Sequence, residues 1–77
     1  MAWSKELIAL TREIIGIGVS MKSGEGGFGM LTSDNDEEGW VITLYDPESH
    51  GFPPKLGTEC IRFGSLDALI AGGWVAD

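Results

Sequence analysis

The segment from Gly39 to Pro47 constrains the fold more than any other, because it holds the densest run of β-branched and aromatic residues. A glycine opens this run and an Asp-Pro pair closes it, which is typical of a β-strand between two turns. Side chains alternate between the two faces of a strand. One face is therefore entirely apolar and consists of Trp40, Ile42 and Leu44. The other is half apolar and consists of Val41, Thr43 and Tyr45.

The N-terminal segment has the pattern of an amphipathic helix over residues 4–15. Ser4 is a typical N-cap, because its hydroxyl can accept a hydrogen bond from a free amide of the first turn. Trp3 precedes the cap and is placed to pack on Ile8 as a hydrophobic staple. Lys5, Thr11 and Arg12 lie between the apolar positions. The apolar positions recur at three- and four-residue spacing, and they are Leu7, Ile8, Leu10, Ile14 and Ile15.

Residues 16–22 allow two interpretations. Gly16 and Gly18 would each cost a helix interior about 1 kcal/mol. Ile17, Val19 and Met21 alternate with small or polar residues, which is the period of a strand. We therefore predict a strand over residues 17–22. The same apolar residues also continue the helical spacing, so a helix that runs to residue 22 is the alternative.

The remaining elements complete an α+β arrangement. We expect a strand over residues 28–32, a polar loop over residues 33–38 and a last strand over residues 58–63. Ser65 then caps a helix that Gly72-Gly73 ends. The apolar stripe of this helix consists of Leu66, Leu69, Ile70 and Trp74. The sequence thus predicts one domain over residues 1–77, a two-layer sandwich. In it, an antiparallel sheet of three or four strands carries the N-terminal and C-terminal helices on its Trp40 face.

Charge and cysteine content limit the functional classes. The net charge is −7, and the five basic residues are scattered, so direct nucleic-acid binding is not expected. The single cysteine, Cys60, cannot form an internal disulfide, which favours the cytoplasm. The chain has no segment of about 20 apolar residues that would span a membrane, and its first residues lack the pattern of a signal peptide, so neither feature is expected.

Four patterns that resemble functional motifs have a simpler structural interpretation. Gly24, Gly26 and Gly29 match a dinucleotide-binding fingerprint, but the residues that follow predict a strand rather than the required helix. Residues 34–39 match half of a calcium-binding loop, yet their flanks predict strands and Tyr45 replaces the expected glutamate. His50 is expected to be a loop residue, and Cys60 to be a buried small apolar group. No catalytic, cofactor or metal site is predicted.

A cluster of acidic residues is the feature to which we assign a function. Six carboxylates and no basic residue lie between positions 34 and 48. They are interpreted as a docking surface that steers a basic protein partner, with Tyr45 as a contact anchor. A solvated loop that only keeps the chain soluble is the alternative. The predicted partner-binding residues are Asp34, Asp36, Glu37, Glu38, Tyr45, Asp46 and Glu48.

In size, acidity and lack of a catalytic constellation, the whole chain resembles the small phage-encoded inhibitors of the anti-CRISPR kind. This resemblance is one of type and rests on no shared motif. It implies a host-cell cytoplasmic, non-enzymatic protein that blocks a basic, nucleic-acid-binding surface of a bacterial protein complex.

Two other functional classes remain open. One is a small homodimer with a structural or assembly role, which would pair the Val41, Thr43 and Tyr45 face or a free edge strand with its copy. The other is an enzyme or ligand carrier that uses His50 and Cys60. This last class is disfavoured, because so small a fold leaves little room for a pocket of about 300 Å³ or more.

Overall fold

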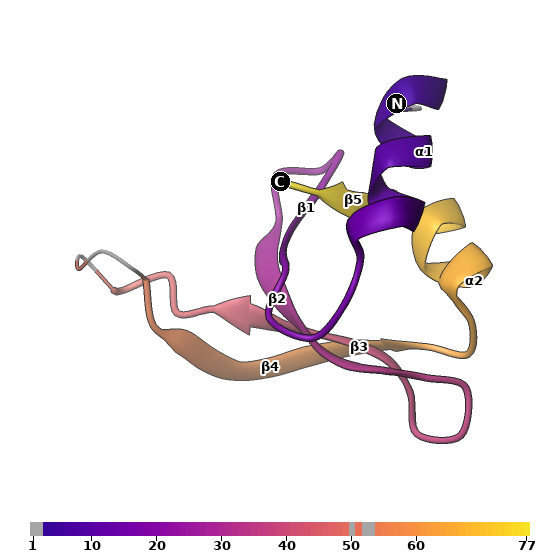
Figure 1. Ribbon diagram of the computed structural model, residues 1–77. Coiled ribbons are helices and arrows are strands. Elements are labelled where there is room, and N and C mark those ends of the chain that lie inside the picture. The colour runs from indigo at the N-terminus through magenta and orange to yellow at the C-terminus, as the bar shows by residue number, and fades with distance from the viewer. Residues whose placement is uncertain (1–2, 50, 52–53) are drawn as a thin grey trace.

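The computed structural model describes residues 3–49, 51 and 54–77, which form one antiparallel sheet and two helices. In chain order the elements are α1 (Lys5–Ile14), β1 (Ser20–Ser23), β2 (Phe28–Asn35), β3 (Gly39–Tyr45), β4 (Leu56–Phe63), α2 (Leu66–Ala71) and β5 (Trp74–Ala76). The strand order is β4-β3-β2-β1-β5, as Figure 1 shows. The α+β class is confirmed. The sheet, however, has five strands rather than the predicted three or four.

Helix α1 is short and ends before the glycines. The Ser4 hydroxyl accepts a hydrogen bond from the amide of Leu7 at 3.2 Å, as its predicted role as a cap requires. Ile15 is already extended, and Gly18 adopts a positive φ of 96°. The alternative of a helix to residue 22 is therefore wrong. The predicted strand is present but lies at Ser20–Ser23, because the glycines form a turn before it.

The β2–β3 hairpin is longer than the sequence suggested. Strand β2 continues to Asn35, so residues 33–35 belong to the sheet and not to the predicted loop. These residues are all polar because they lie at the solvated end of the hairpin. They therefore lack the alternation of apolar and polar residues by which a strand is predicted. The Ser33 hydroxyl donates to the carbonyl of Gly39 at 2.7 Å and helps to close this end. The register shifts between Leu31 and Ser33.

The core lies on the face that the central strand predicted. Ile42 is fully buried, and Trp40 and Leu44 pack against the core while remaining partly exposed. The buried cluster combines residues from β1, β2, β3, α2 and β5, namely Met21, Leu31, Ile42, Leu69 and Trp74.

The C-terminal segment differs most from the prediction. Ser65 caps α2 by accepting from the amide of Ala68 at 3.1 Å, and Gly72 ends the helix as expected. Gly73 then adopts a φ of 95° and reverses the chain. Trp74 is therefore not on the helix stripe but in β5, where it is 4% exposed. The prediction failed because β5 is defined by pairing with β1, more than 50 residues away in the chain.

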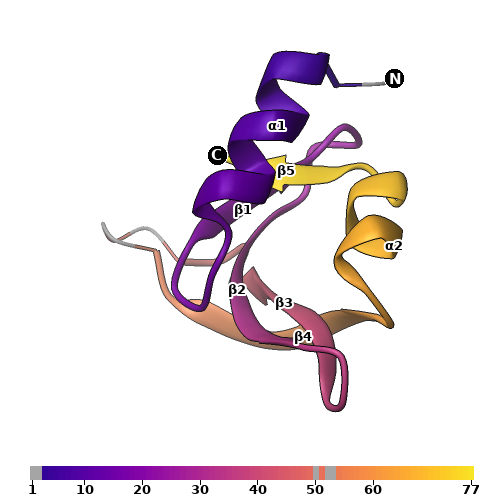
Figure 2. The ribbon, with the colours of Figure 1, turned by 45° about the vertical axis from the view of Figure 1, so that its right-hand side comes forward.

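The sheet is strongly curved, so the description as a two-layer sandwich is only approximate (Figure 2). Helix α2 contacts both β4 and β5, which are the two edge strands of this sheet. Helix α1 instead packs against β5. An ion pair between Arg12 and Asp67, at 2.8 Å, joins the two helices.

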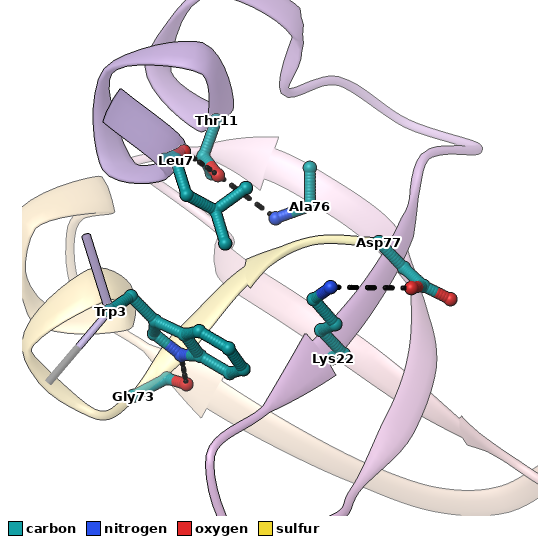
Figure 3. Close-up of polar contacts among 7 residues, drawn as sticks. All are labelled: Trp3, Leu7, Thr11, Lys22, Gly73, Ala76 and Asp77. Atoms are coloured by element: carbon teal, nitrogen blue, oxygen red, sulfur yellow. Dashed lines mark hydrogen bonds and ion pairs between the residues drawn. The ribbon is translucent and has the colours of Figure 1, made fainter. Parts of the chain in front are cut away.

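Helix α1 protects the outer edge of β5 (Figure 3). The amide of Asp77 bonds to Ser20 in β1, so the amide of Ala76 points away from the sheet. Thr11 is fully buried. Its hydroxyl accepts from the amide of Ala76 at 3.0 Å and donates to the carbonyl of Leu7 at 2.8 Å. The outward amide of Ala76 on this edge is thus satisfied by a helix side chain.

The Trp3 indole also binds this edge, by donating to the carbonyl of Gly73 at 2.7 Å (Figure 3). The ammonium group of Lys22 lies 5.4 Å from the centre of the Trp3 ring, within the range of a cation–π contact. The same Lys22 approaches the carboxylate of Asp77 at 3.7 Å. The two ends of the described chain are therefore held together.

Candidate functional site

The first group of predicted site residues lies at the turn of the β2–β3 hairpin, which projects from the molecule in both ribbon views (Figures 1 and 2). Four carboxylates, which we call the acidic tip, lie in or beside this turn and are all exposed. They are Asp34, Asp36, Glu37 and Glu38.

Side-chain hydrogen bonds order the acidic tip. The Asn35 side-chain oxygen accepts from the amide of Glu38 at 2.6 Å, and the Trp40 indole donates to the Asp36 carboxylate at 2.8 Å. Gly39 closes the turn with a φ of 96°, a conformation that other residues rarely adopt. These contacts fix the backbone conformation of the turn that carries the four carboxylates.

A positive charge lies beside the acidic tip. A Cβ atom added to Gly39 would lie 2.6 Å from Nε of Arg62, so the Arg62 side chain packs directly over this glycine. Arg62 is opposite Val41 in the β3–β4 ladder. The Gly39 position thus serves two purposes, because it allows the turn and leaves room for the arginine.

The second group of predicted site residues lies at the other end of β3. Tyr45 is the last residue of this seven-residue strand, and Asp46 and Glu48 follow it. A strand rises about 3.3 Å per residue, so the acidic tip and this group are about 20 Å apart. The structure therefore does not bring the predicted residues together as one surface.

Internal contacts hold the second group in place. The Tyr45 hydroxyl lies 2.7 Å from the Ser20 hydroxyl, so Tyr45 ties β3 to β1 across β2 and is half-buried. The Asp46 carboxylate accepts from the amide of Glu48 at 2.9 Å, and the amide of Asp46 donates to the carbonyl of Lys55 at 2.8 Å.

An open groove of about 810 Å³ adjoins this second group, and sequence reasoning did not predict it. The expectation that the fold leaves little room for a pocket is therefore wrong. The groove lies between the β1–β2 turn, the end of β3 and the beginning of β4. Its lining includes Phe28 from β2, Leu44 from β3, Pro54 from the preceding loop, and Leu56 and Glu59 from β4.

The residues considered for catalysis do not form a site in the described part of the chain. Cys60 lies in β4 and is exposed, which corrects the expectation of a buried thiol; its sulfur is 4.0 Å from the carbonyl of Thr58. His50 lies outside the described residues. Within residues 3–49, 51 and 54–77, no group of three or more potential ligands could hold a metal ion.

The strands predicted beside the two motif-like patterns are present. Gly24 and Gly26 lie in the β1–β2 turn, and Gly29 lies within β2 rather than at the start of a helix. A Cβ atom at Gly29 would lie 2.6 Å from the carbonyl oxygen of Thr43, so this glycine permits close strand contact. The calcium-loop pattern at residues 34–39 is flanked by β2 and β3.

Comparisons with known proteins assign no family. A scan against protein-family models, a search of curated proteins and a search of solved structures each gave no significant match. Neither helix of the described chain has the length and apolar character that crossing a membrane requires.

Proposed function

We propose that this chain is a non-enzymatic binding protein that docks its acidic tip on a basic surface of another protein. The observation that carries this proposal is the ordered presentation of four exposed carboxylates at a projecting turn. In the manner of anti-CRISPR inhibitors, the partner would be a bacterial complex whose basic surface binds nucleic acid, and docking would block that surface.

Physical chemistry supports this role in two ways. Clustered carboxylates attract a basic surface over a distance of about 10 Å at ordinary ionic strength, which raises the rate of association. The hydrogen bonds from the Trp40 indole to Asp36 and from the Glu38 amide to the Asn35 side chain order the turn before binding, so less conformational entropy is lost when the partner docks. Direct binding of nucleic acid is not proposed, because the net charge of −7 would oppose it.

The test neutralises the acidic tip without changing its shape. The tip variant combines Asp34→Asn, Asp36→Asn, Glu37→Gln and Glu38→Gln, and the amide at position 36 still offers an oxygen to the Trp40 indole. A partner captured from bacterial lysate at low salt and identified by mass spectrometry would then be purified for binding kinetics. We expect the association rate to fall by about tenfold or more, with a smaller effect on dissociation.

The matched control removes the same charge elsewhere. It combines Glu6→Gln, Glu13→Gln, Asp67→Asn and Asp77→Asn, all exposed positions outside the hairpin. The control variant should retain most of the wild-type association rate. Raising the salt concentration from about 50 to about 500 mM should reproduce the effect of the tip variant, because it screens long-range attraction. Capture of the partner by the tip variant at the wild-type rate in low salt would contradict the proposal.

A homodimer is the second candidate, and the position of β4 favours it. This strand has eight residues and lies at the edge of the sheet that the described residues form. Its outer backbone groups are therefore available to pair with a second copy. Light scattering after size-exclusion chromatography would measure the mass in solution, and a monomer at high concentration would exclude this candidate.

A further inference from the structure

The groove between β2, β3 and β4 exposes apolar side chains that a small domain would normally cover. Phe28 is 53% exposed and Leu56 is 41% exposed, and both line this groove. Leu44, Pro47 and Pro54 extend the same apolar lining. Contiguous apolar surface of this kind is typical of binding sites.

The backbone forms the groove through an irregularity in the β3–β4 ladder. Thr43 pairs with Cys60 and Tyr45 pairs with Leu56, so residues 57–59 of β4 lie opposite Leu44 alone. This bulge interrupts regular pairing beside the groove. Gly26, Gly27 and Gly57 also line it, and a Cβ atom at Gly26 would meet nothing within 4 Å.

The charges around the groove are mainly negative. Asp46 and Glu59 belong to its lining. Glu48 is adjacent to Pro47 in sequence. Lys55, between Pro54 and Leu56, is the basic residue nearest in sequence to this lining. An apolar floor with a carboxylate rim complements an apolar side chain that is flanked by cations.

We propose that this groove binds an extended segment of a protein partner in which one aromatic or aliphatic side chain is flanked by lysine or arginine. This inference rests on the proposed function, because the segment would belong to the partner that the acidic tip attracts. The tip accelerates the encounter, and the groove anchors the complex by burying Phe28, Leu56 and the apolar side chain of the segment. The two sites thus control different rates of the same interaction.

The experiment uses short synthetic peptides as probes and the nitrogen–proton NMR spectrum of the full chain as readout. The first peptide has a central phenylalanine flanked by lysines. The second replaces the phenylalanine with alanine, and the third replaces the lysines with glutamates. We expect the first peptide to shift the amide signals of Gly26, Gly27 and Gly57 in a saturable way. The second should affect the acidic tip only, and the third should affect neither site.

Two single substitutions test the apolar floor. Phe28→Ser and Leu56→Ser change exposed side chains, so the fold should persist. Each should weaken binding of the first peptide by about tenfold. The matched control is Ile17→Ser, because Ile17 is 66% exposed and does not line the groove. This control should bind the peptide like the wild type. Glu59→Gln with Asp46→Asn should weaken binding of the lysine-flanked peptide and increase its dependence on the central phenylalanine.

Other results would overturn this inference. Equal groove shifts with the lysine- and glutamate-flanked peptides would show that the groove selects no cations. Shifts confined to the acidic tip would show that the groove binds no segment, while leaving the proposed function intact. If the first peptide shifted the groove signals but the tip variant associated with the partner at the wild-type rate, the groove would still be a binding site. The proposed docking role of the acidic tip would be wrong. A dimer that Phe28→Ser dissociates would identify a second copy as the occupant.

Discussion

At the scale of single residues, Trp74 is more deeply buried than Trp40, although the sequence places Trp40 in the central strand. Trp74 is 4% exposed within the buried cluster, whereas Trp40 is partly exposed and its indole binds Asp36 at the hairpin. We expect Trp74→Ala to lower the free energy of unfolding by about 3–5 kcal/mol, because it leaves a large cavity. Trp40→Ala should cost clearly less, because water already contacts part of that ring. Urea titration followed by circular dichroism measures both values.

A conservative variant separates packing from hydrogen bonding at Trp40. Trp40→Phe retains an aromatic ring against the core but removes the donor to Asp36. It should cost about 1 kcal/mol, which is the usual net value of one such bond. A larger loss for Trp40→Ala than for Trp74→Ala would mean that the centre of the core lies at β3 and not beside β5.

At the scale of secondary-structure elements, the contact between α1 and β5 depends on Thr11. Thr11→Val has nearly the same shape but leaves the outward amide of Ala76 without its acceptor. Burying an amide without a partner costs about 1–3 kcal/mol. Thr11→Ser retains the oxygen and should lose less. Hydrogen exchange measured by NMR gives a direct test, because the amide of Ala76 should exchange faster in the valine variant and remain protected in the serine variant. Unchanged protection in both variants would contradict this contact.

The helices and strands differ in how far the sequence could predict them. Local signals correctly placed Ser4 and Ser65 as caps, because a cap bonds to an amide three residues away. The apolar face of β3 was also predictable from its alternation. By contrast, the hydrogen bond from Ala76 to Thr11 and the strand at Trp74 join positions more than 50 residues apart, which no local period encodes.

The candidate site was predictable in composition but not in arrangement. Exposure of the carboxylates at the acidic tip follows from their polarity, and the structure agrees. Their grouping with Tyr45 and Asp46 assumed that neighbours in sequence form one surface. An extended strand separates its ends, so these residues lie apart. The groove could not be predicted, because it depends on how the β1–β2 turn approaches the irregular part of β4.

At the scale of the whole molecule, stability depends on joining the two ends of the chain. Trp3 binds Gly73, Thr11 binds Ala76, and both contacts hold α1 against the last strand. A chain of 77 residues buries only about 60% of the surface that its unfolded form exposes, so it has few other interactions to compensate. Loss of β5 should therefore affect elements far from it in sequence, including α1.

The corresponding prediction is that a chain without residues 74–77 lacks a cooperative unfolding transition. The truncation removes the buried Trp74 and Val75, leaves β1 without its outer partner and deprives Thr11 of Ala76. A chain without Asp77 alone is the control. It loses one backbone bond to Ser20 and a 3.7 Å ion pair with Lys22, so it should unfold cooperatively with a loss of about 1–2 kcal/mol. Differential scanning calorimetry distinguishes the two chains. If the shorter chain retained a sharp transition and dispersed NMR signals, the core would be complete without β5. The contacts of α1 and α2 with β5 would then contribute little to stability.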